Sequence, residues 1–224
     1  MPKVRKEYFD EKREQILEAA LAVCNRKPAY DVTMSDIVAE TGLSQGGVYK
    51  YFNNIDLVLA ALIDKANTKG NYSSLIDEVM GSDDTPGKKL NGLFLISCNY
   101  FSDMLISYNK LLFELSTMSA YSPERNERIS SHVTTASTFG YLISKASELI
   151  LSGTAEGYFT PVIPVQDVMA FIVASFDGII RDVTLTRCYQ TDDAPPSGIS
   201  FDEKVLIRGL YLSTMTLLGR PQNS

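Results

Sequence analysis

The chain has 224 residues, of which 45% are hydrophobic and 21% charged, and its formal net charge is −6 at pH 7. This composition is typical of a globular protein with one domain, or with a small domain joined to a larger one, and it excludes a disordered or collagen-like chain. Three scattered cysteines favour a reducing, cytoplasmic location over a disulfide or zinc framework, and no stretch has the apolar length of a membrane helix or a signal peptide.

The negative charge is unevenly spread along the chain. Residues 1–56 carry eight Lys and Arg against nine Asp and Glu, whereas residues 57–224 carry thirteen against eighteen. Because nucleic-acid binding usually needs a basic surface, a DNA-binding face here would be a local patch on the nearly neutral N-terminal part. The acidic remainder would then have a different task.

The first predicted element is an amphipathic helix over residues 11–26. Its apolar side chains recur at helical spacing, as at Ile16, Ala20 and Val23, which indicates that one face is buried. Pro28 ends the helix, since the residue before a proline disfavours helical backbone angles.

A short helix, a tight turn and another helix follow. Thr33 has the character of an N-cap, with the acidic Asp36 three residues later at the positive end of the helix. Gly42 suits the left-handed position that ends a helix, and Ser44 is a second N-cap, for a helix over residues 45–52. Helix, glycine-containing turn and helix together are the signature of a helix-turn-helix.

The rest of the chain is predicted to consist of further helices. The first starts after the cap residue Asn54 and extends towards residue 80, although Gly70 and Asn71 weaken it. The others are expected at residues 88–107, 110–121, 123–153, 165–189 and 200–219. No stretch alternates polar and apolar residues with period two, so we expect no strand. The predicted fold class is all-α, with an N-terminal three-helix helix-turn-helix domain at residues 1–53 and a larger helical domain at residues 54–224.

The last two predicted helices, at residues 165–189 and 200–219, are apolar on more than one face. A helix that is apolar all round is buried, and here the second face lies either in the protein's own core or against a second copy. We favour a homodimer because two neighbouring helices share the pattern, and we expect Leu210 and Leu217 to face the partner.

Several features between Gln15 and Leu57 occur together: a threonine cap, an Asp-Ile pair, Gly-Leu-Ser, a Gly-Gly pair, Tyr-Lys-Tyr-Phe and a new helix two residues later. In this combination the segment resembles the DNA-binding domain of the TetR family of transcriptional regulators. The rest of the chain resembles the family only in its helical layout and length. The resemblance implies a ligand-responsive homodimer, usually a repressor, that binds a near-palindromic operator in double-stranded DNA.

The helix-turn-helix supplies the candidate DNA-binding residues. Its second helix enters the major groove, and helix N-termini contact phosphates. Thr33 and Ser44 therefore suit phosphate oxygens. The amide of Gln45 fits the edge of adenine, while Gly46 and Gly47 let the helix approach the bases closely. By resemblance, three further residues contact phosphates or bases: Tyr49, Lys50 and Tyr51.

The same residues also have a purely structural interpretation, in which Tyr49 and Tyr51 are core aromatics and Gln45 is merely solvated. A glycine in a helix costs roughly 1 kcal/mol relative to alanine, so a pair in one short helix favours the DNA-binding interpretation. Val48 and Phe52, four residues apart, are expected to form the buried edge of this helix.

By resemblance, a small-molecule effector binds in the larger domain, in a cavity among the helices that follow Leu57. Helical phase selects six candidate lining residues: Phe94, Cys98, Phe101, Phe113, Tyr141 and Phe176. These side chains favour a hydrophobic or aromatic effector, whereas Asp177, a further candidate, would suit a cationic one. Asp177 also has a structural interpretation, which we favour, as half of a buried ion pair with Arg181 four residues later.

Signals for catalysis are sparse. His132 is the only histidine, in a predicted helix rich in Ser and Thr, and no nucleophile elbow, phosphate loop or metal-ligand spacing accompanies it. We therefore expect no enzyme, no catalytic residue, no metal, no cofactor and no membrane partner. The main alternative is a helical small-molecule-binding or scaffolding protein without operator binding. Basic residues common in the family near Gln45 and Ile55 are absent here, which keeps this alternative open.

Overall fold

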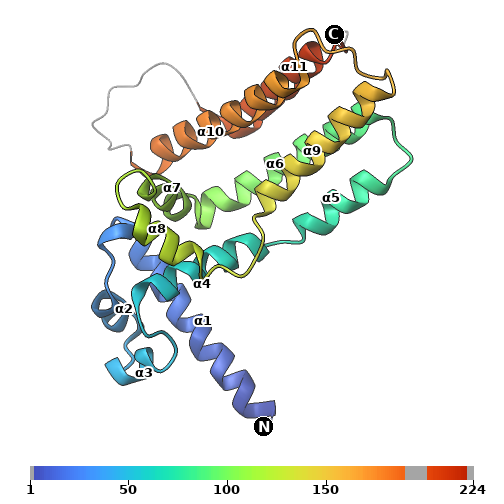
Figure 1. The fold of residues 1–224 in the computed structure, drawn as a ribbon. Helices are drawn as coiled ribbons and strands as arrows, with labels where there is room; N and C mark the ends of the chain where they lie inside the picture. Colours follow the sequence, from blue (N-terminus) through green and yellow to red (C-terminus); the bar gives the residue numbers. More distant parts are fainter. Residues whose placement is uncertain (1–2, 190–200, 221–224) are drawn as a thin grey trace. The chain divides into compact units, whose positions relative to one another are not determined.

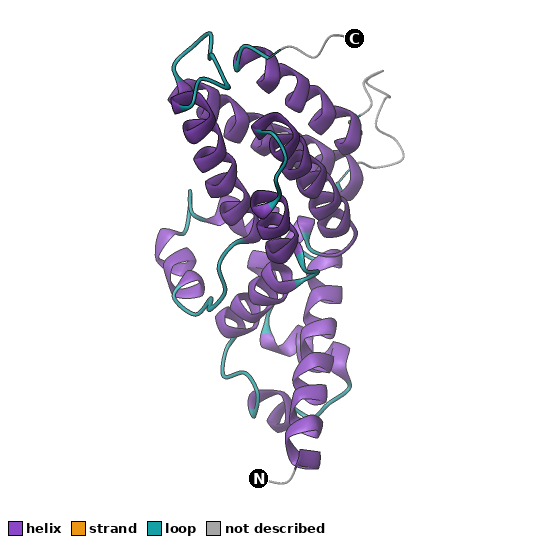
Figure 2. Ribbon diagram, turned by 90° about the vertical axis from the view of Figure 1, so that its right-hand side faces the viewer, coloured by secondary structure: helices purple, strands orange, loops and turns teal. Residues whose placement is uncertain are grey.

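In the computed structural model, which describes residues 3–189 and 201–220, every regular element is a helix (Figures 1 and 2), so the predicted all-α class is confirmed. The elements are α1 (Lys3–Arg26), the 3₁₀ turn η1 (Ala29–Asp31), α2 (Met34–Thr41), α3 (Gln45–Tyr49), α4 (Ile55–Thr68), α5 (Tyr72–Gly81), α6 (Pro86–Ser107), α7 (Asn109–Met118), α8 (Pro123–Ser130), α9 (Thr138–Ala155), α10 (Val165–Cys188) and α11 (Glu203–Leu217). Within the described part of the chain, none of these helices combines the length and the hydropathy that a membrane crossing requires.

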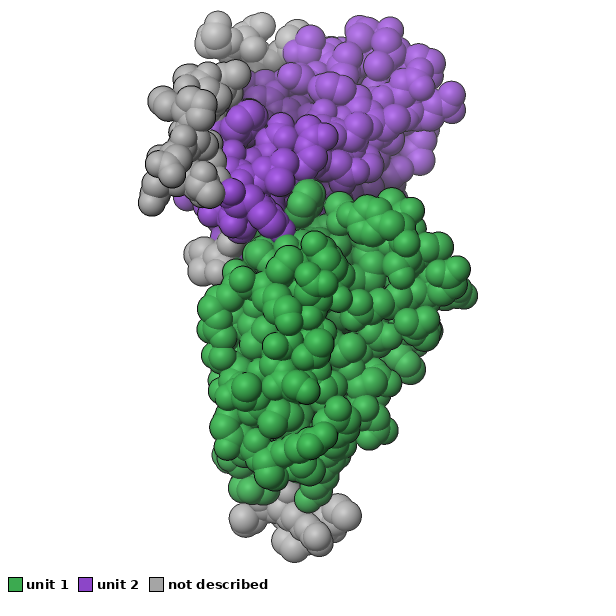
Figure 3. All heavy atoms as spheres, turned by 90° about the vertical axis from the view of Figure 1, so that its left-hand side faces the viewer, with its two compact units in different colours: residues 1–68, 106–135 green, residues 69–105, 136–224 purple. Residues whose placement is uncertain are grey.

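The chain folds into two compact units, which Figure 3 colours separately. Unit 1 consists of residues 1–68 and 106–135, and unit 2 of residues 69–105 and 136–224. The segment 106–135 therefore shares a unit with the N-terminal helices. The predicted boundary between residues 53 and 54 separates a DNA-binding domain from an effector-binding domain by function, not by compactness. This boundary stays a prediction.

Unit 1 is built around the helix-turn-helix. α1 packs on α2, α4 and α7, and α2 packs on α3. The fully buried side chains of Ile16, Ile37, Val48 and Leu59 come from all four N-terminal helices, so these helices share one hydrophobic core.

A buried ion pair attaches α7 to the end of α1. Lys110 Nζ lies 2.8 Å from Glu114 Oε1 and donates to the carbonyl oxygens of Cys24 at 2.7 Å and Lys27 at 3.1 Å. Glu114 Oε2 accepts the backbone N–H of Ala29 at 2.7 Å. The last carbonyl groups of a helix have no hydrogen-bond donor within the helix. Lys110, more than 80 residues later in the sequence, donates hydrogen bonds to the carbonyl groups at the end of α1.

The link between α8 and α9 corrects one prediction. A single helix was expected over residues 123–153, but α8 ends at Ser130 and α9 begins at Thr138. Between them, the backbone N–H and hydroxyl groups of Thr134 and Thr135 donate to the carboxylate of Asp64 on α4, at 2.7–2.9 Å. Because these N–H groups donate to Asp64, they are not available for hydrogen bonds within a helix. The helix is therefore interrupted between α8 and α9. His132 lies exposed in this connection rather than in a helix.

A second break lies where the sequence is weakest. The helix expected from residue 55 towards residue 80 is divided into α4 and α5, with Gly70 between them at φ +73°. A side chain at Gly70 would be strained by this backbone angle, and its Cβ would lie 2.7 Å from the ring of Tyr72. Glycine is therefore required at this turn.

Unit 2 has α6 at its centre. Phe94 and Phe101 on α6 contact Phe176 on α10, with ring centroids 5.7 and 5.6 Å apart, and Phe139 on α9 joins them at 5.2 Å from Phe101. α5 packs on α9, α9 on α10, and α10 on α11. The helix that is buried on most sides is thus α6, whereas α10 and α11 each keep an exposed face.

The exposed faces of α10 and α11 carry apolar side chains among charged ones such as Asp177 and Arg208. The two helices lie side by side (Figure 1). Leu210, expected to face a partner, is only 5% exposed, because it packs inside its own chain. Leu217, the other residue expected to face a partner, is half-buried, and the exposed apolar side chains are those of Phe171, Leu185, Val205 and Leu212.

Candidate functional site

α2 starts and ends at the predicted residues and α3 starts at the predicted Gln45, but α3 ends at Tyr49 rather than at residue 52. Thr33 and Asp36 form a reciprocal capping box at the start of α2: Thr33 Oγ1 accepts the N–H of Asp36, and Asp36 Oδ2 accepts the N–H of Thr33. Gly42 ends α2 in the left-handed conformation, at φ +65°. Ser44 then caps α3, where its Oγ accepts the N–H of Gly47 at 3.1 Å. The turn geometry is therefore encoded by four local residues.

The capping carboxylate is stabilised in its ionised form. Asp36 Oδ2 accepts hydrogen bonds from Lys27 Nζ and from both the N–H and the hydroxyl of Thr33, each at 2.8 Å. These bonds, the one from Lys27 above all, lower the pKa of Asp36 to about 2. The cap is therefore fully charged at neutral pH.

We expect Asp36→Asn to lower Tm at neutral pH, and the difference from the unmodified protein to shrink under acid. Losing a cap contact typically costs about 1 kcal/mol, or about 2–4 °C in a chain of this size. The folded pKa of about 2 lies below the roughly 3.9 of an unfolded aspartate, so the stabilisation is complete above about pH 4 and is lost as pH falls towards 2. Calorimetry from pH 7 to pH 3 measures this, with Glu11→Gln as control, since Glu11 is an exposed acid of α1 that pairs with none of the described cations. A constant difference across that range would contradict it.

α3 separates an inner from an outer face. Val48 is fully buried, and so is Phe52 just beyond the helix, as predicted. Gln45, Gly46 and Lys50 are exposed on the opposite side. Tyr49 is 38% exposed, so it is not a core aromatic. The outer face thus carries polar and small side chains without a role in the core.

The two glycines of α3 differ in what surrounds them. A Cβ added to Gly47 would lie 3.2 Å from Ser44 Oγ, so the cap itself favours glycine there. A Cβ added to Gly46 would meet no atom within 4 Å, and the backbone of Gly46 does not have a positive φ. No contact among the described residues therefore explains a glycine at position 46.

Two residues of α1 that sequence reasoning missed support α3 from behind. The ring of Phe9 lies 4.5 Å from that of Tyr51, and the Arg13 guanidinium lies 5.1 Å from the ring of Phe52. Tyr51 is consequently half-buried, in contrast to Tyr49. Phe9, Arg13 and Leu17 follow one another at spacing i and i+4, so Phe9 and Arg13 extend the buried face of α1 backwards, and this spacing was the signal available in the sequence.

In unit 2 the structure brings some of the candidate effector residues together. The rings of Phe94, Phe101 and Phe176 form the aromatic cluster described above, and all three are buried. Cys98 lies on α6 between Phe94 and Phe101 and is half-buried. Phe94, Phe101 and Phe176 are therefore packed together, and Cys98 lies beside them on α6.

The other three candidates lie elsewhere. Tyr141 on α9 donates a hydrogen bond to Asp77 on α5 near the surface. Phe113 lies on α7 and belongs to unit 1. Asp177 is exposed, and Arg181 forms a salt bridge with Asp182 at 2.9 Å. The prediction of a buried ion pair between Asp177 and Arg181 was therefore wrong. Within residues 3–189 and 201–220, no three His, Cys, Asp or Glu side chains gather as metal ligands would.

Comparison with known proteins adds to this geometry. Residues 16–62 match the family model described as bacterial regulatory proteins, tetR family. The whole chain is similar to the HTH-type transcriptional regulator YfiR of Bacillus subtilis (strain 168), with 27% identity over 229 residues and 96% of each chain covered.

Solved structures share the fold at low sequence identity. A TetR transcription regulator from Haloarcula marismortui superposes with a TM-score of 0.61 at 19% identity, covering 94% of this chain and 97% of that one. The SmeT–triclosan complex superposes with a TM-score of 0.63 at 17% identity, covering 92% and 90%. The likeness thus extends through both units.

Proposed function

We propose that the chain, whose residues 16–62 match the model of the tetR family of bacterial regulatory proteins, is a transcriptional regulator of that family: a homodimeric repressor that a small-molecule effector releases from a palindromic operator. The observation that carries the proposal is Gly46. This glycine lies on the exposed face of the recognition helix α3, and no contact within the chain requires it. A close approach of DNA bases to α3 supplies the missing reason.

Each predicted DNA-binding residue then has a task. Gln45 reads a base edge beside Gly46, while Tyr49 and Lys50 reach outward from the end of α3. Ser44 Oγ accepts a hydrogen bond from Gly47, which leaves its hydroxyl hydrogen to donate to a phosphate. Thr33, Gly47 and Tyr51 both stabilise the helix-turn-helix and contact the sugar-phosphate backbone of the DNA. Thr33 donates its hydroxyl to Asp36 in the free protein, and a phosphate contact requires that hydroxyl to turn.

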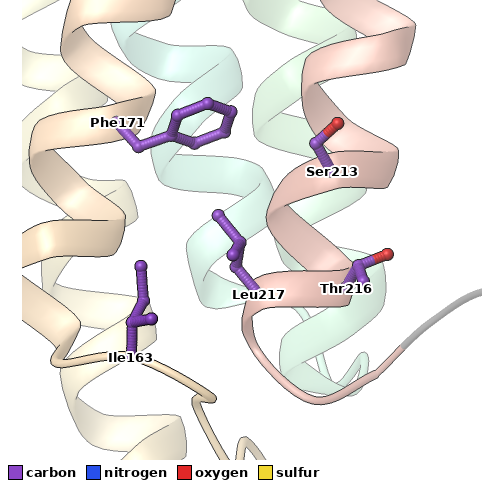
Figure 4. Close-up of a pocket in the computed structure, with 5 residues that line it drawn as sticks. All are labelled: Ile163, Phe171, Ser213, Thr216 and Leu217. Atoms are coloured by element: carbon purple, nitrogen blue, oxygen red, sulfur yellow. The ribbon is translucent and has the colours of Figure 1, made fainter.

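The exposed faces of α10 and α11 support the dimer. Between them lies a hollow of about 440 Å³, lined by Ile163, Phe171, Ser213, Thr216 and Leu217 (Figure 4). Gly178 on α10 and Gly209 on α11 lie inside helices, yet a Cβ added to either would meet no atom within 4 Å. A helix glycine that nothing in its own chain explains is accounted for by the close approach of a second copy.

The effector would act by changing the separation of the two recognition helices. In a dimer these helices read successive major grooves roughly 34 Å apart. α4 follows α3 directly, and the chain passes into unit 2 immediately after α4, at residues 68–69. SmeT, a structural neighbour, was solved with triclosan, and the aromatic cluster around Phe94 suits a hydrophobic or aromatic ligand. A 100-fold release from DNA requires about 2.7 kcal/mol of coupling between the two sites.

A mobility-shift experiment with the DNA upstream of the gene tests the proposal. We expect a shifted band at 50 mM salt and weaker binding at 200 mM. Since few basic residues face outward near α3, the loss of affinity should be less than the roughly 1,000-fold seen for proteins with six or more phosphate contacts. A steeper loss would contradict this count of contacts. Absence of a shift at both salt concentrations would favour the helical small-molecule-binding alternative.

A further inference from the structure

A second hollow lies in unit 2, between α6 and α11, with a volume of about 430 Å³. We call it the α6–α11 groove. Its floor consists of the buried side chains of Phe94, Ile207 and Tyr211, and its rim includes the exposed Leu95 and Leu212. Small-molecule sites in proteins have volumes of about 300–1,000 Å³ and mostly apolar walls. The groove is therefore large enough, and apolar enough, to hold a ligand of that kind.

Two cationic side chains line the groove beside this apolar floor. Lys204 and Arg208 line the groove from successive turns of α11, and both are exposed. Among the described residues, no acid lines the groove, and none forms a salt bridge with either cation. Two like charges at spacing i and i+4 destabilise a helix slightly, and an anion bound between them removes that repulsion.

The charge of unit 2 makes this pair unusual. Unit 2 carries nine Lys and Arg against fourteen Asp and Glu, a net charge of −5. Two acids stand at the start of α11: Asp202 accepts the backbone N–H groups of Lys204 and Val205, and Glu203 is buried and bound by Arg187 at 2.6 Å and Ser102 at 3.0 Å. Neither carboxylate forms a salt bridge with Lys204 or Arg208, so both cations can bind an anion.

The groove has Lys204, Cys98 and Asn99 at one end, and Asn91, Tyr211 and Leu212 at the other. Glu203, at the start of α11, contacts Ser102 near the end of α6, while a Cβ added to Gly87 at the start of α6 would lie 3.5 Å from Met215. The two helices are therefore antiparallel. Lys204 consequently lies at the end that holds Asn99 and Cys98, whereas the contact of Phe94 with Tyr211, at 5.5 Å, lies further along.

We propose that the α6–α11 groove binds an amphipathic anion, whose carboxylate or phosphate head lies between Lys204 and Arg208 and whose apolar chain lies along Phe94 and Leu95. Asn99 lines the same end and can donate its amide hydrogens to the head. This assignment rests on the proposed function in naming the chemical class of the effector. It adds a charged end to the apolar ligand that the aromatic residues alone would suggest.

Calorimetric titration of the full chain with decanoate, decyl phosphate and neutral decanol tests the inference. We expect both anions to bind at least about tenfold more tightly than decanol, since only they engage the two cations. Affinity for decanoate should fall as salt rises, and each methylene added from octanoate to decanoate should raise it by about fourfold. Tighter binding of decyl phosphate would identify a phosphate head, and tighter binding of decanoate a carboxylate head.

Variants separate this groove from non-specific uptake. Lys204→Gln with Arg208→Gln should weaken decanoate binding at least about tenfold and leave decanol unchanged. Leu95→Asn, on the exposed rim, should weaken both ligands without loss of fold. Arg181→Gln, an exposed arginine of α10 outside the groove, is the matched control and should change neither.

Three results would overturn the inference: equal affinity for decanoate and decanol, no effect of the double variant, or dissociation of the dimer by decanoate, which would make the groove a contact between subunits. Operator binding is measured separately. Decanoate that binds through Lys204 and Arg208 but leaves operator affinity unchanged would support the site and contradict its role as the effector site. A chain that binds decanoate but never shifts operator DNA would contradict the proposed function alone.

Discussion

Replacing Gly46 with leucine should abolish operator binding and leave the fold intact. A Cβ at this position meets no atom of the chain, and leucine is a better helix former than glycine by about 0.5–1 kcal/mol, so Tm should hold or rise. The new side chain would occupy the space where α3 meets the base edges. We expect affinity to fall by at least about 100-fold, equivalent to about 2.7 kcal/mol.

Companion variants distinguish loss of contact from loss of fold. Tyr49→Ala and Lys50→Ala remove exposed side chains and should also abolish binding while circular dichroism stays unchanged. Val48→Ala, in the same helix, removes methyl groups from a fully buried side chain and should lower Tm. Full operator affinity in Gly46→Leu would show that α3 does not enter the major groove.

Gly209→Glu or Phe171→Glu should convert the dimer into a folded monomer. Each change places a carboxylate on the exposed face of α11 or α10, where the folded chain tolerates it but a dry interface does not. Glutamate is also a better helix former than glycine, so Gly209→Glu should not weaken α11 itself. A monomer engages only one half-site, and we expect operator affinity to fall by at least about 100-fold.

Sedimentation and mobility shift measure the two effects together. The monomer should also show about half the dependence of log affinity on log salt, since it contacts half as many phosphates. Leu151→Glu on α9, another exposed leucine, is the matched control and should remain dimeric. If both variants stay dimeric and bind the operator normally, the interface lies away from α10 and α11. Leu210→Glu would not be informative, because this leucine is buried in its own chain.

The candidate DNA-binding motif follows from the sequence because its determinants are local. Thr33 and Asp36, or Ser44 and Gly47, are three residues apart and satisfy each other within one helical turn. The left-handed turn at Gly42 needs only a glycine. Such interactions are set by neighbours in the chain, so the residue order determines them.

The candidate effector residues were harder to choose. Helical phase indicates that a side chain such as Phe94 or Tyr141 points inward, but it does not show which helix lies opposite. Phe94 faces α10 and α11 and lines the α6–α11 groove, whereas Tyr141 faces Asp77 near the surface. Whether such a side chain lies in the core, in a binding site or near the surface depends on which helix packs opposite it.

The sequence by itself therefore determined the all-α class, the helix-turn-helix with its caps, and two C-terminal helices with apolar surface to cover. Only the tertiary structure decided that α8 and α9 are separate helices, that residues 106–135 belong with the N-terminal helices, and that Lys204 and Arg208 overlie an apolar floor. Each of these rests on groups far apart in sequence, as when Asp64 takes the N–H groups of Thr134 and Thr135, 70 and 71 residues later. Periodicity records which way a side chain points along its own helix, and the packing of the helices determines what it meets there.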